Sequence, residues 1–275
     1  MTLSEPPTFE PYRFRTRNVR EGENKVHSPE EAQERGFRGS IVGGATVYGQ
    51  MIHPLVERYG LDWLGSSWLS IRFKRPAYDG DIVETRFEPE DDAEAGAASL
   101  RVRTYDDEGC ELLEMRAHLV TDFPDPDPRV SLDPIEWEGD RVEGTFDRMV
   151  LDRPFRTLHW KLSLDEQIEY CEATEDPLPI YREGANPPAH PGLIMSQGSY
   201  VVQNQFVMPF WIHGSSTLLI RRAIRVGDAV EQRCVPYEKW HRGGSDWVKF
   251  YQLYLVDGEP AIEVWKTSVI RVAQR

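Results

Sequence analysis

The sequence predicts an α+β protein of two similar halves, in which a central helix precedes an antiparallel sheet in each half. A stretch rich in proline and aspartate, residues 122–140, divides the 275-residue chain nearly in two, and this composition resists both helix and central strand. On each side of it, a run with helical spacing of apolar residues is followed by runs that alternate between apolar and polar residues. The same order of elements in both halves predicts an internal repeat.

The first half is expected to begin with helices. Ser28-Pro29-Glu30-Glu31 combines a helix-capping serine, a proline at the first helical position and a glutamate that completes a capping box, and Gly36 ends this helix. A longer helix is predicted for residues 44–59 from the spacing of their apolar side chains. Pro54 lies inside this run, so we expect a kink or a break there. Strands are then predicted at residues 68–73, 82–87, 100–105 and 112–123.

The second half repeats this order. Ser163-Leu164-Asp165-Glu166 is another capping box and opens a helix that continues through Ala173. Residues 192–206 are apolar on most sides, which is typical of a buried helix. The Gly227-Asp228 turn has a counterpart at Gly80-Asp81, and each turn connects two predicted strands. Strands are predicted at residues 217–222, 229–234, 247–256 and 261–272, which gives domains at 1–125 and 141–275 with a linker at 126–140.

Composition excludes several classes of function. The 46 acidic and 32 basic side chains leave a formal net charge of −14, which repels phosphate backbones and anionic lipid surfaces. No run approaches the ~18 apolar residues of a membrane-spanning helix, and the N-terminus lacks the segments of a signal peptide. Cys110, Cys171 and Cys234 are far apart, which disfavours a disulfide framework or a CxxC metal site. We therefore expect a cytoplasmic protein with no metal and no nucleic-acid or membrane partner.

Two segments resemble the start of a MaoC-like dehydratase domain, from the family that includes the (R)-specific enoyl-CoA hydratases. The first runs from Asn24 to Ala32 and continues from Gly36 to Gly44, and the second runs from Ala173 to Tyr181. The resemblance implies a double hotdog fold, in which each half is a central helix wrapped by an antiparallel sheet. It also implies a hydro-lyase that adds or removes water on an acyl thioester of coenzyme A or of acyl carrier protein. Coenzyme A would be part of the substrate, and no other cofactor is expected.

The hydratase motif of that family, Asp-x-Asn-Pro-x-His, is incomplete in the first half. Asn24 and His27 match it, but Gly22 stands at the aspartate position and Lys25 at the proline position. Glu23 lies beside the empty position, and a carboxylate near His27 would orient its ring and raise its basicity. Hydration of an enoyl thioester needs a base for the water and a proton for the α-carbon. His27, Glu23 and Asn24 are therefore the catalytic candidates of this half.

The motif is incomplete in the second half as well. Asp176 and Pro179 match it, whereas Leu178 and Tyr181 replace its asparagine and histidine. Asp176 is a fourth catalytic candidate, although an aspartate in such a turn also commonly caps its own backbone. Tyr181 is a candidate for donating a hydrogen bond to the substrate. Because the repeat would place Asp176 and His27 at opposite sites, we do not predict that these two residues form one dyad.

The start of each central helix is the expected position of the thioester. Gly43 and Gly44 are expected to let the thioester carbonyl approach backbone N–H groups that stabilise an enolate oxygen. His190 lies at the corresponding helix start of the second half and is a candidate for bordering the pocket. Four tryptophans of the second half are expected in the core or in a subunit interface, namely Trp211, Trp240, Trp247 and Trp265.

Two other functions remain open. A hotdog thioesterase needs only an activated water and an oxyanion site, which Glu23, His27 and the same glycines would also supply. A non-catalytic protein that binds acyl thioesters, or the supporting subunit of a hetero-oligomer, would account for two incomplete motifs. A duplicated hotdog forms its own pseudo-dimer interface, so a monomer and a homodimer are both compatible with the sequence.

Overall fold

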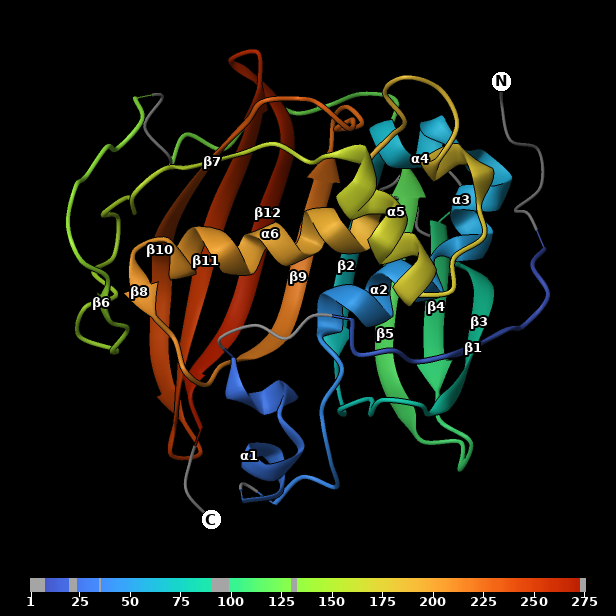
Figure 1. The fold of residues 1–275 in the computed structure, drawn as a ribbon, viewed down its shortest axis with the longest axis horizontal. Coiled ribbons are helices and arrows are strands. Elements are labelled where there is room, and N and C mark those ends of the chain that lie inside the picture. Colours follow the sequence, from blue (N-terminus) through green and yellow to red (C-terminus); the bar gives the residue numbers. More distant parts are fainter. Residues whose placement is uncertain (1–7, 20–23, 35, 91–98, 130–132, 273–275) are drawn as a thin grey trace.

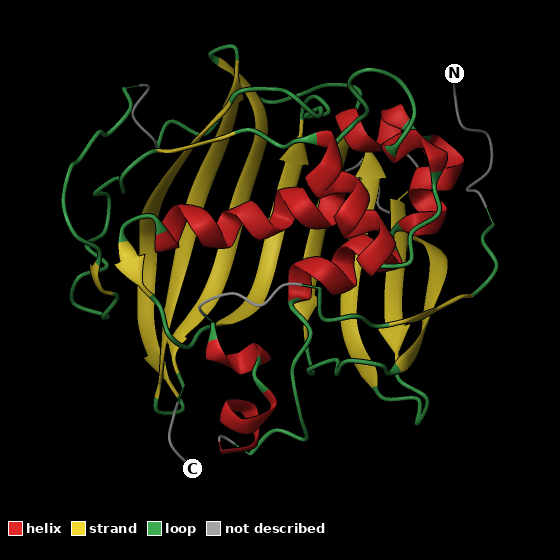
Figure 2. Ribbon diagram, viewed as in Figure 1, coloured by secondary structure: helices red, strands yellow, loops and turns green. Residues whose placement is uncertain are grey.

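A single antiparallel sheet, covered by helices on one face, forms the body of the molecule (Figures 1 and 2). The computed structural model of the chain describes residues 8–19, 24–34, 36–90, 99–129 and 133–272. The first half supplies strands β1 (Tyr12–Arg15), β2 (Ser67–Phe73), β3 (Ile82–Glu90), β4 (Ser99–Tyr105) and β5 (Glu111–Leu119). The second half supplies β7 (Leu158–Trp160), β9 (Ile212–Ile220), β10 (Val230–Arg242), β11 (Ser245–Val256) and β12 (Glu259–Arg271), while β6 (Val142–Glu143) and β8 (Phe206–Val207) form a separate parallel pair.

The two halves are related by a pseudo-twofold axis that passes between β2 and β9. The strand order is β1-β3-β4-β5-β2-β9-β12-β11-β10-β7, so each half contributes one contiguous block of the sheet. At the junction Ser70 lies opposite Thr217, its own counterpart 147 positions later in the chain, and the Thr217 hydroxyl donates to Ser70 Oγ at 3.3 Å. A repeated strand that pairs with itself across a twofold axis gives this register. The predicted strands of both halves are present, and the predicted double hotdog architecture is confirmed.

The helices lie close to their predicted positions, and the predicted break near Pro54 is present. Ile52 ends one helix and begins the next, with Pro54 in the first turn of the second helix, where its missing N–H breaks no helical hydrogen bond. Ser163 and Glu166 form the predicted capping box. Within the described ranges, no helix is long and apolar enough to span a membrane. The helices are η1 (Lys25–His27), α1 (Pro29–Glu34), α2 (Gly44–Met51), α3 (His53–Tyr59), α4 (Leu61–Gly65), α5 (Leu164–Ala173), η2 (Pro179–Tyr181) and α6 (Pro191–Gln203).

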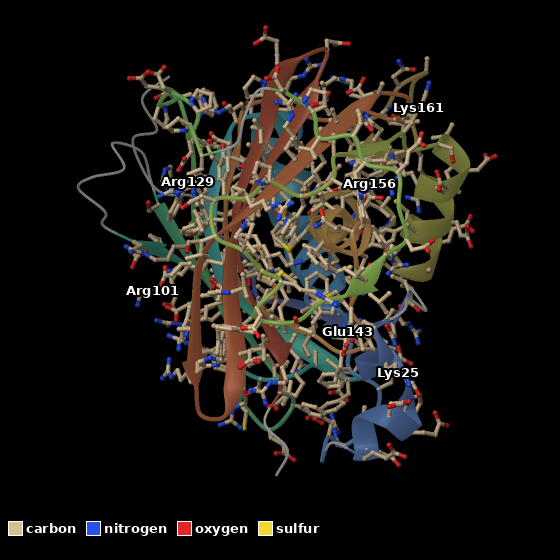
Figure 3. All side chains as sticks on the ribbon, turned by 90° about the vertical axis from the view of Figure 1, so that its left-hand side faces the viewer. Lys25, Arg101, Arg129, Glu143, Arg156 and Lys161 are labelled. Atoms are coloured by element: carbon tan, nitrogen blue, oxygen red, sulfur yellow. The ribbon has the colours of Figure 1, made fainter. Side chains whose placement is uncertain are left out.

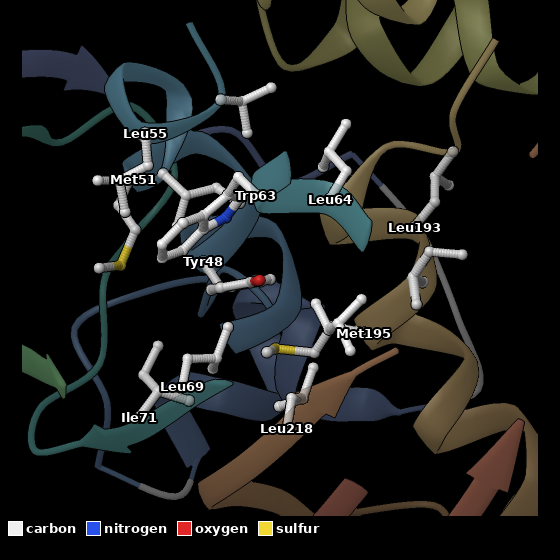
Figure 4. Close-up of a cluster of buried hydrophobic side chains, with 14 of the residues drawn as sticks. Tyr48, Met51, Leu55, Trp63, Leu64, Leu69, Ile71, Leu193, Met195 and Leu218 are labelled. Carbon is white, nitrogen blue, oxygen red and sulfur yellow. The ribbon is translucent and has the colours of Figure 1, made fainter. Parts of the chain in front are cut away.

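The two central helices, α2 and α6, contact each other directly above the junction of the two half-sheets. A Cβ at Gly49 of α2 would lie 2.8 Å from Gly192 Cα of α6, so this close approach requires glycine. The main core fills the space between these helices and the sheet (Figure 4). Side chains from both halves meet there, including Tyr48, Met51, Leu55, Trp63, Leu69, Ile71, Leu193, Met195 and Leu218.

The outer face of the sheet differs between the halves. On the first half it carries charged side chains such as Arg101, which forms an ion pair with Glu90 and projects away from the helices (Figure 3). On the second half the chain that follows β5 crosses this face, and the Asp127 N–H donates to Glu263 Oε1 at 2.8 Å. This covering segment belongs to the predicted linker and allows the strands beneath it to carry apolar residues outward. Those buried residues are Val235, Tyr251, Leu253 and Leu255.

Candidate functional site

A cavity of about 300 Å³ lies at the N-terminal end of α2, where the two halves meet. Its walls come from η1, α2 and the segment after β2 in the first half, and from α6, β9 and β12 in the second. This volume is at the lower end of the range of small-molecule sites. Four of the predicted residues line the cavity, namely His27, Asn24, Gly43 and Gly44.

The imidazole of His27 is oriented as a base. Its Nδ1 lies 2.6 Å from the carbonyl oxygen of Ile41, which can only accept, so Nδ1 carries the proton and Nε2 keeps its lone pair. Burial lowers the pKa of His27, although the bond to Ile41 opposes this effect, and the ring is therefore neutral at neutral pH. The backbone oxygen of His27 accepts hydrogen bonds from Asn18 Nδ2 at 3.3 Å and from the Ser40 hydroxyl. These contacts fix the turn that carries the ring.

The N-terminus of α2 lies against this ring, and no described residue caps it with a side chain. A Cβ at Gly43 would lie 3.6 Å from Cε1 and 4.0 Å from Nε2 of His27. Gly43 is the N-cap residue and has no side chain, so within the described part of the chain the first N–H groups of the helix, on Gly44 and Ala45, have neither a side-chain cap nor an intrahelical acceptor. These N–H groups carry the partial positive charge of the helix start. A base and a site that attracts an oxyanion are therefore adjacent in one cavity.

The other two candidates of the first half have different outcomes. Asn24 Nδ2 donates to the backbone oxygen of Trp211 at 2.9 Å, and the Trp211 N–H donates to Asn24 Oδ1 at 3.4 Å, so this amide fastens the turn before His27 to the start of β9. Glu23 and Gly22 lie outside the described residues, and the pairing of Glu23 with His27 stays a prediction. The described residues that line the cavity include no carboxylate.

The candidates of the second half form a separate, buried cluster around Asp176. Asp176 Oδ2 accepts from His190 Nε2 and Oδ1 accepts from His53 Nδ1, both at 3.1 Å. The Leu178 N–H donates to Oδ1 at 3.0 Å, which is the predicted turn chemistry. Burial by itself would raise the pKa of Asp176, but the hydrogen bonds from His190 and His53 hold it well below its usual range. A second cavity of about 300 Å³ borders this carboxylate, and it does not include His27.

His190 uses both ring nitrogens within the protein. Its Nδ1 accepts a hydrogen bond from the Gly192 N–H at 3.1 Å and so caps α6, while Nε2 carries the proton and donates to Asp176. Burial lowers the pKa of His190, although the hydrogen bond and the charge of Asp176 oppose this effect. The ring is completely buried and has no free lone pair to offer a substrate.

In the repeat His190 is the counterpart of Gly43. The isolated bridge that Ile41 forms in the first half recurs 147 positions later at Pro188, and the same offset leads from Gly43 to His190. The ring of Tyr181 packs on His190 with ring centroids 4.6 Å apart, and the Tyr181 hydroxyl makes no hydrogen bond to a described residue. The helix start that is open in the first half is therefore filled by side chains in the second.

The sequence prediction did not include several residues that line the inner part of the cavity. Trp211 and Trp247 line it, and Trp211 also belongs to the core, as predicted. His213 packs on Phe73 with ring centroids 4.7 Å apart, and burial lowers its pKa well below the usual value. Lys266 of β12 also lines the cavity.

A sequence signal for Lys266 exists. Residues Ile262, Val264, Lys266, Ser268 and Ile270 alternate along β12 and are all buried on the side of the sheet that the period of two predicts. A lysine within such an inward row is the unusual feature.

Among the described residues, no group of three His, Cys, Asp or Glu side chains is placed to hold a metal ion.

The comparisons with known proteins identify the fold. The sequence matches no known family model and no curated protein. Among solved structures it is similar to a protein from Chloroflexus aurantiacus J-10-fl named as a MaoC domain dehydratase, with 12% identity and a TM-score of 0.65 over 98% of this chain and 97% of that one. It is also similar to a conserved hypothetical protein from Mycobacterium tuberculosis with a double hotdog fold, with 14% identity and a TM-score of 0.62 over 96% of both chains.

A thioesterase is also similar in structure. A protein from Lactobacillus plantarum named as an oleoyl thioesterase shares 12% identity, with a TM-score of 0.52 over 96% of both chains. At these identities the likeness concerns the fold, and the chain has the double hotdog fold found in MaoC-like dehydratases. The same fold is present in proteins named for two different reactions, so the residues of the cavity, and not the fold, decide the chemistry.

Proposed function

We propose that the protein is a hydro-lyase that adds water to an enoyl thioester of coenzyme A, or removes it from the 3-hydroxyacyl thioester. The observation that carries this proposal is the position of His27 Nε2 beside the uncapped N-terminus of α2. Water activation and stabilisation of an enolate oxygen are the two requirements of this reaction, and both groups lie in one cavity. The fold supports the same substrate class.

The proposed hydration proceeds in two steps. His27 Nε2 takes a proton from water while the water oxygen bonds to the β-carbon, and the π electrons move to the thioester oxygen as an enolate. The N–H groups of Gly44 and Ala45 hold that oxygen. The imidazolium of His27 then returns the proton to the α-carbon, which gives the 3-hydroxyacyl thioester. No cofactor is needed beyond the coenzyme A of the substrate, and Glu23 is proposed to support the imidazolium.

The second candidate function is an acyl-CoA thioesterase. It is favoured by the absence of a carboxylate among the described residues that line the cavity, because the hydratase motif pairs its histidine with an aspartate. In this reaction the water activated by His27 attacks the thioester carbonyl carbon. The same N–H groups hold the tetrahedral oxyanion, and the coenzyme A thiolate leaves and takes the proton from the imidazolium.

Mass spectrometry of products distinguishes these reactions. Purified protein is incubated with a panel of enoyl-CoA thioesters that begins with crotonyl-CoA. A product heavier by one water with its thioester intact supports the hydro-lyase, whereas free coenzyme A with the released acid supports the thioesterase. If the ligands raise the melting temperature but no product forms, the protein binds acyl thioesters without turning them over.

A further inference from the structure

Lys266 is a buried lysine whose partners in the structure are uncharged. Its exposed fraction is 2%, and its Nζ donates to Ser199 Oγ at 3.0 Å. The same Nζ lies 4.6 Å from the centroid of the Trp211 ring. Lys266, Ser199 and Trp211 all line the cavity that contains His27. Among the described residues, none places a carboxylate within ion-pair distance of this ammonium group.

Two other basic residues of the chain are held by carboxylates. Lys74, at the rim of the cavity, is held by the carboxylates of Glu111 and Glu114 at 2.6 and 2.7 Å. Arg221 is paired with the buried Glu263. A charged group removed from water is costly unless an opposite charge compensates it. For Lys266 this compensation is missing inside the cavity, although the site has room for a ligand.

Burial has the expected effect on this group. It lowers the pKa of Lys266 to about 7, and Cys234 opposes this effect. An anionic ligand in the cavity would favour the protonated amine, and the amine in turn would favour the anion. Ser199 and Trp211 would hold the ammonium group in place through a hydrogen bond and a cation–π contact.

We propose that Lys266 binds a carboxylate at the far end of the acyl group, so that the substrate is the coenzyme A monothioester of a short unsaturated dicarboxylic acid. This inference rests on the proposed function, because it assumes that the thioester lies at the N-terminus of α2. The two ends of the site are connected through Trp211, whose backbone pairs with Asn24 beside His27 and whose ring contacts Lys266. Because one residue, Trp211, contacts both ends, we infer a short acyl group between them.

Matched pairs of thioesters test this inference. Fumaryl-CoA and crotonyl-CoA have four-carbon acyl groups that end in a carboxylate or a methyl group, and glutaconyl-CoA and 2-pentenoyl-CoA form the corresponding five-carbon pair. We expect kcat/KM of the wild-type protein to favour the carboxylate in at least one pair by about a hundredfold, the scale of a buried charge pair. Equal kcat/KM values within both pairs would overturn the inference.

The variant Lys266→Met removes the charge and keeps the length of the side chain. We expect it to lose the preference for the carboxylate and to retain turnover of the methyl-ended thioester, because His27 and α2 are untouched. Lys249→Met is the matched control, since Lys249 lies in the neighbouring strand and pairs with Glu238 at 2.6 Å outside the cavity. An unchanged preference in Lys266→Met, with a native circular dichroism spectrum, would contradict the role of Lys266.

Binding of saturated thioesters separates the failure of this inference from the failure of the proposed reaction. Calorimetry with succinyl-CoA and butyryl-CoA measures the preference for a carboxylate without any turnover. A preference for succinyl-CoA that Lys266→Met abolishes supports the inference even if no hydration is detected. Equal affinity for both thioesters overturns the inference alone, and no binding of either overturns both the inference and the proposed substrate class.

Discussion

The first half keeps a histidine that is free to act as a base, whereas the second half uses its histidine to hold the fold together. His27 donates from Nδ1 to a carbonyl oxygen and leaves Nε2 to the cavity. His190 has the opposite tautomer, with Nδ1 on the Gly192 N–H and Nε2 on Asp176. Nothing in the sequence around the two histidines distinguishes a base from a structural residue. Their hydrogen-bond partners decide which ring has a lone pair to offer a substrate.

The two halves of the duplicated fold therefore have different roles, one at a cavity and one in the core. His190 stands where the first half has Gly43, and its side chain closes the start of α6. Tyr181 stands at the motif position that His27 has in the first half, and it packs on His190. The start of α6 gains the buried hydrogen bonds of His190 to Asp176 and to the Gly192 N–H. The site at the start of α2 keeps helix N–H groups that no described side chain caps, and such groups are useful to a ligand and costly to stability.

The largest expected effect concerns the open site. His27→Ala should lower kcat/KM by about a thousandfold, the usual scale for a general base, while the melting temperature changes little. Steady-state kinetics with the best thioester of the panel measures this effect. His159→Ala is the control, because His159 is exposed and pairs with Glu136 outside the cavity. Wild-type turnover in His27→Ala would remove His27 from the mechanism.

Loss of Asp176 beside His190 should affect stability and not turnover. Asp176→Ala leaves His53 and His190 without their buried carboxylate, which should lower the free energy of unfolding by about 3–5 kcal/mol. We expect kcat of the folded protein to remain close to the wild-type value. Urea unfolding and kinetics at low temperature measure the two quantities, with Asp107→Ala in an exposed turn as the control. Lost turnover at unchanged stability would place Asp176 in the mechanism.

Gly43→Asp converts the open helix start into a closed one. The backbone of Gly43 has φ −57° and ψ 132°, which any residue adopts, and a Cβ there makes ordinary contacts. The new carboxylate should cap α2 and occupy the position of the oxyanion, so kcat should fall by about a hundredfold. The melting temperature should stay level or rise slightly. Gly43→Ala adds the Cβ without an acceptor and serves as the control, and equal rates in the two variants would exclude α2 as the oxyanion site.

The two halves should also differ in how acid affects them. Because burial lowers the pKa of His27, its base form persists below the ordinary value of about 6.5, and kcat/KM should begin to fall only below that pH. The Asp176→Ala variant should leave the fall of kcat/KM in acid unchanged. A fall of kcat/KM with its midpoint above about pH 6.5 would contradict the buried, neutral state of His27.

The free energy of unfolding should also depend on pH. The pKa of Asp176 is lower in the folded than in the unfolded protein, so its contribution is complete above the unfolded pKa of about 3.9 and is lost as the pH falls below it. The difference in unfolding free energy between wild type and Asp176→Ala should therefore shrink in acid. Urea titrations at a series of pH values measure this difference. A difference that stays constant in acid would contradict a lowered pKa of Asp176 in the folded protein.

Much of the fold could be predicted because its signals are local. Alternation of apolar residues located the strands, the Ser163 capping box located α5, and Pro54 located the break between α2 and α3. The site could be predicted only in part. His27 and the glycines follow a local motif, but Lys266 meets Ser199 and Trp211 across long stretches of chain, and no short pattern connects them.

Spacing and turn residues act over a few positions, so the repeat, the elements and the groups that can do chemistry follow from the order of the residues. Which histidine is a base, which helix start is open and which lysine is buried without a described carboxylate depend on contacts that form only in the folded chain. Protonation and accessibility depend on the groups that surround a side chain. For Asn24 and Trp211 those groups are 187 positions apart in the chain, and folding alone brings them together.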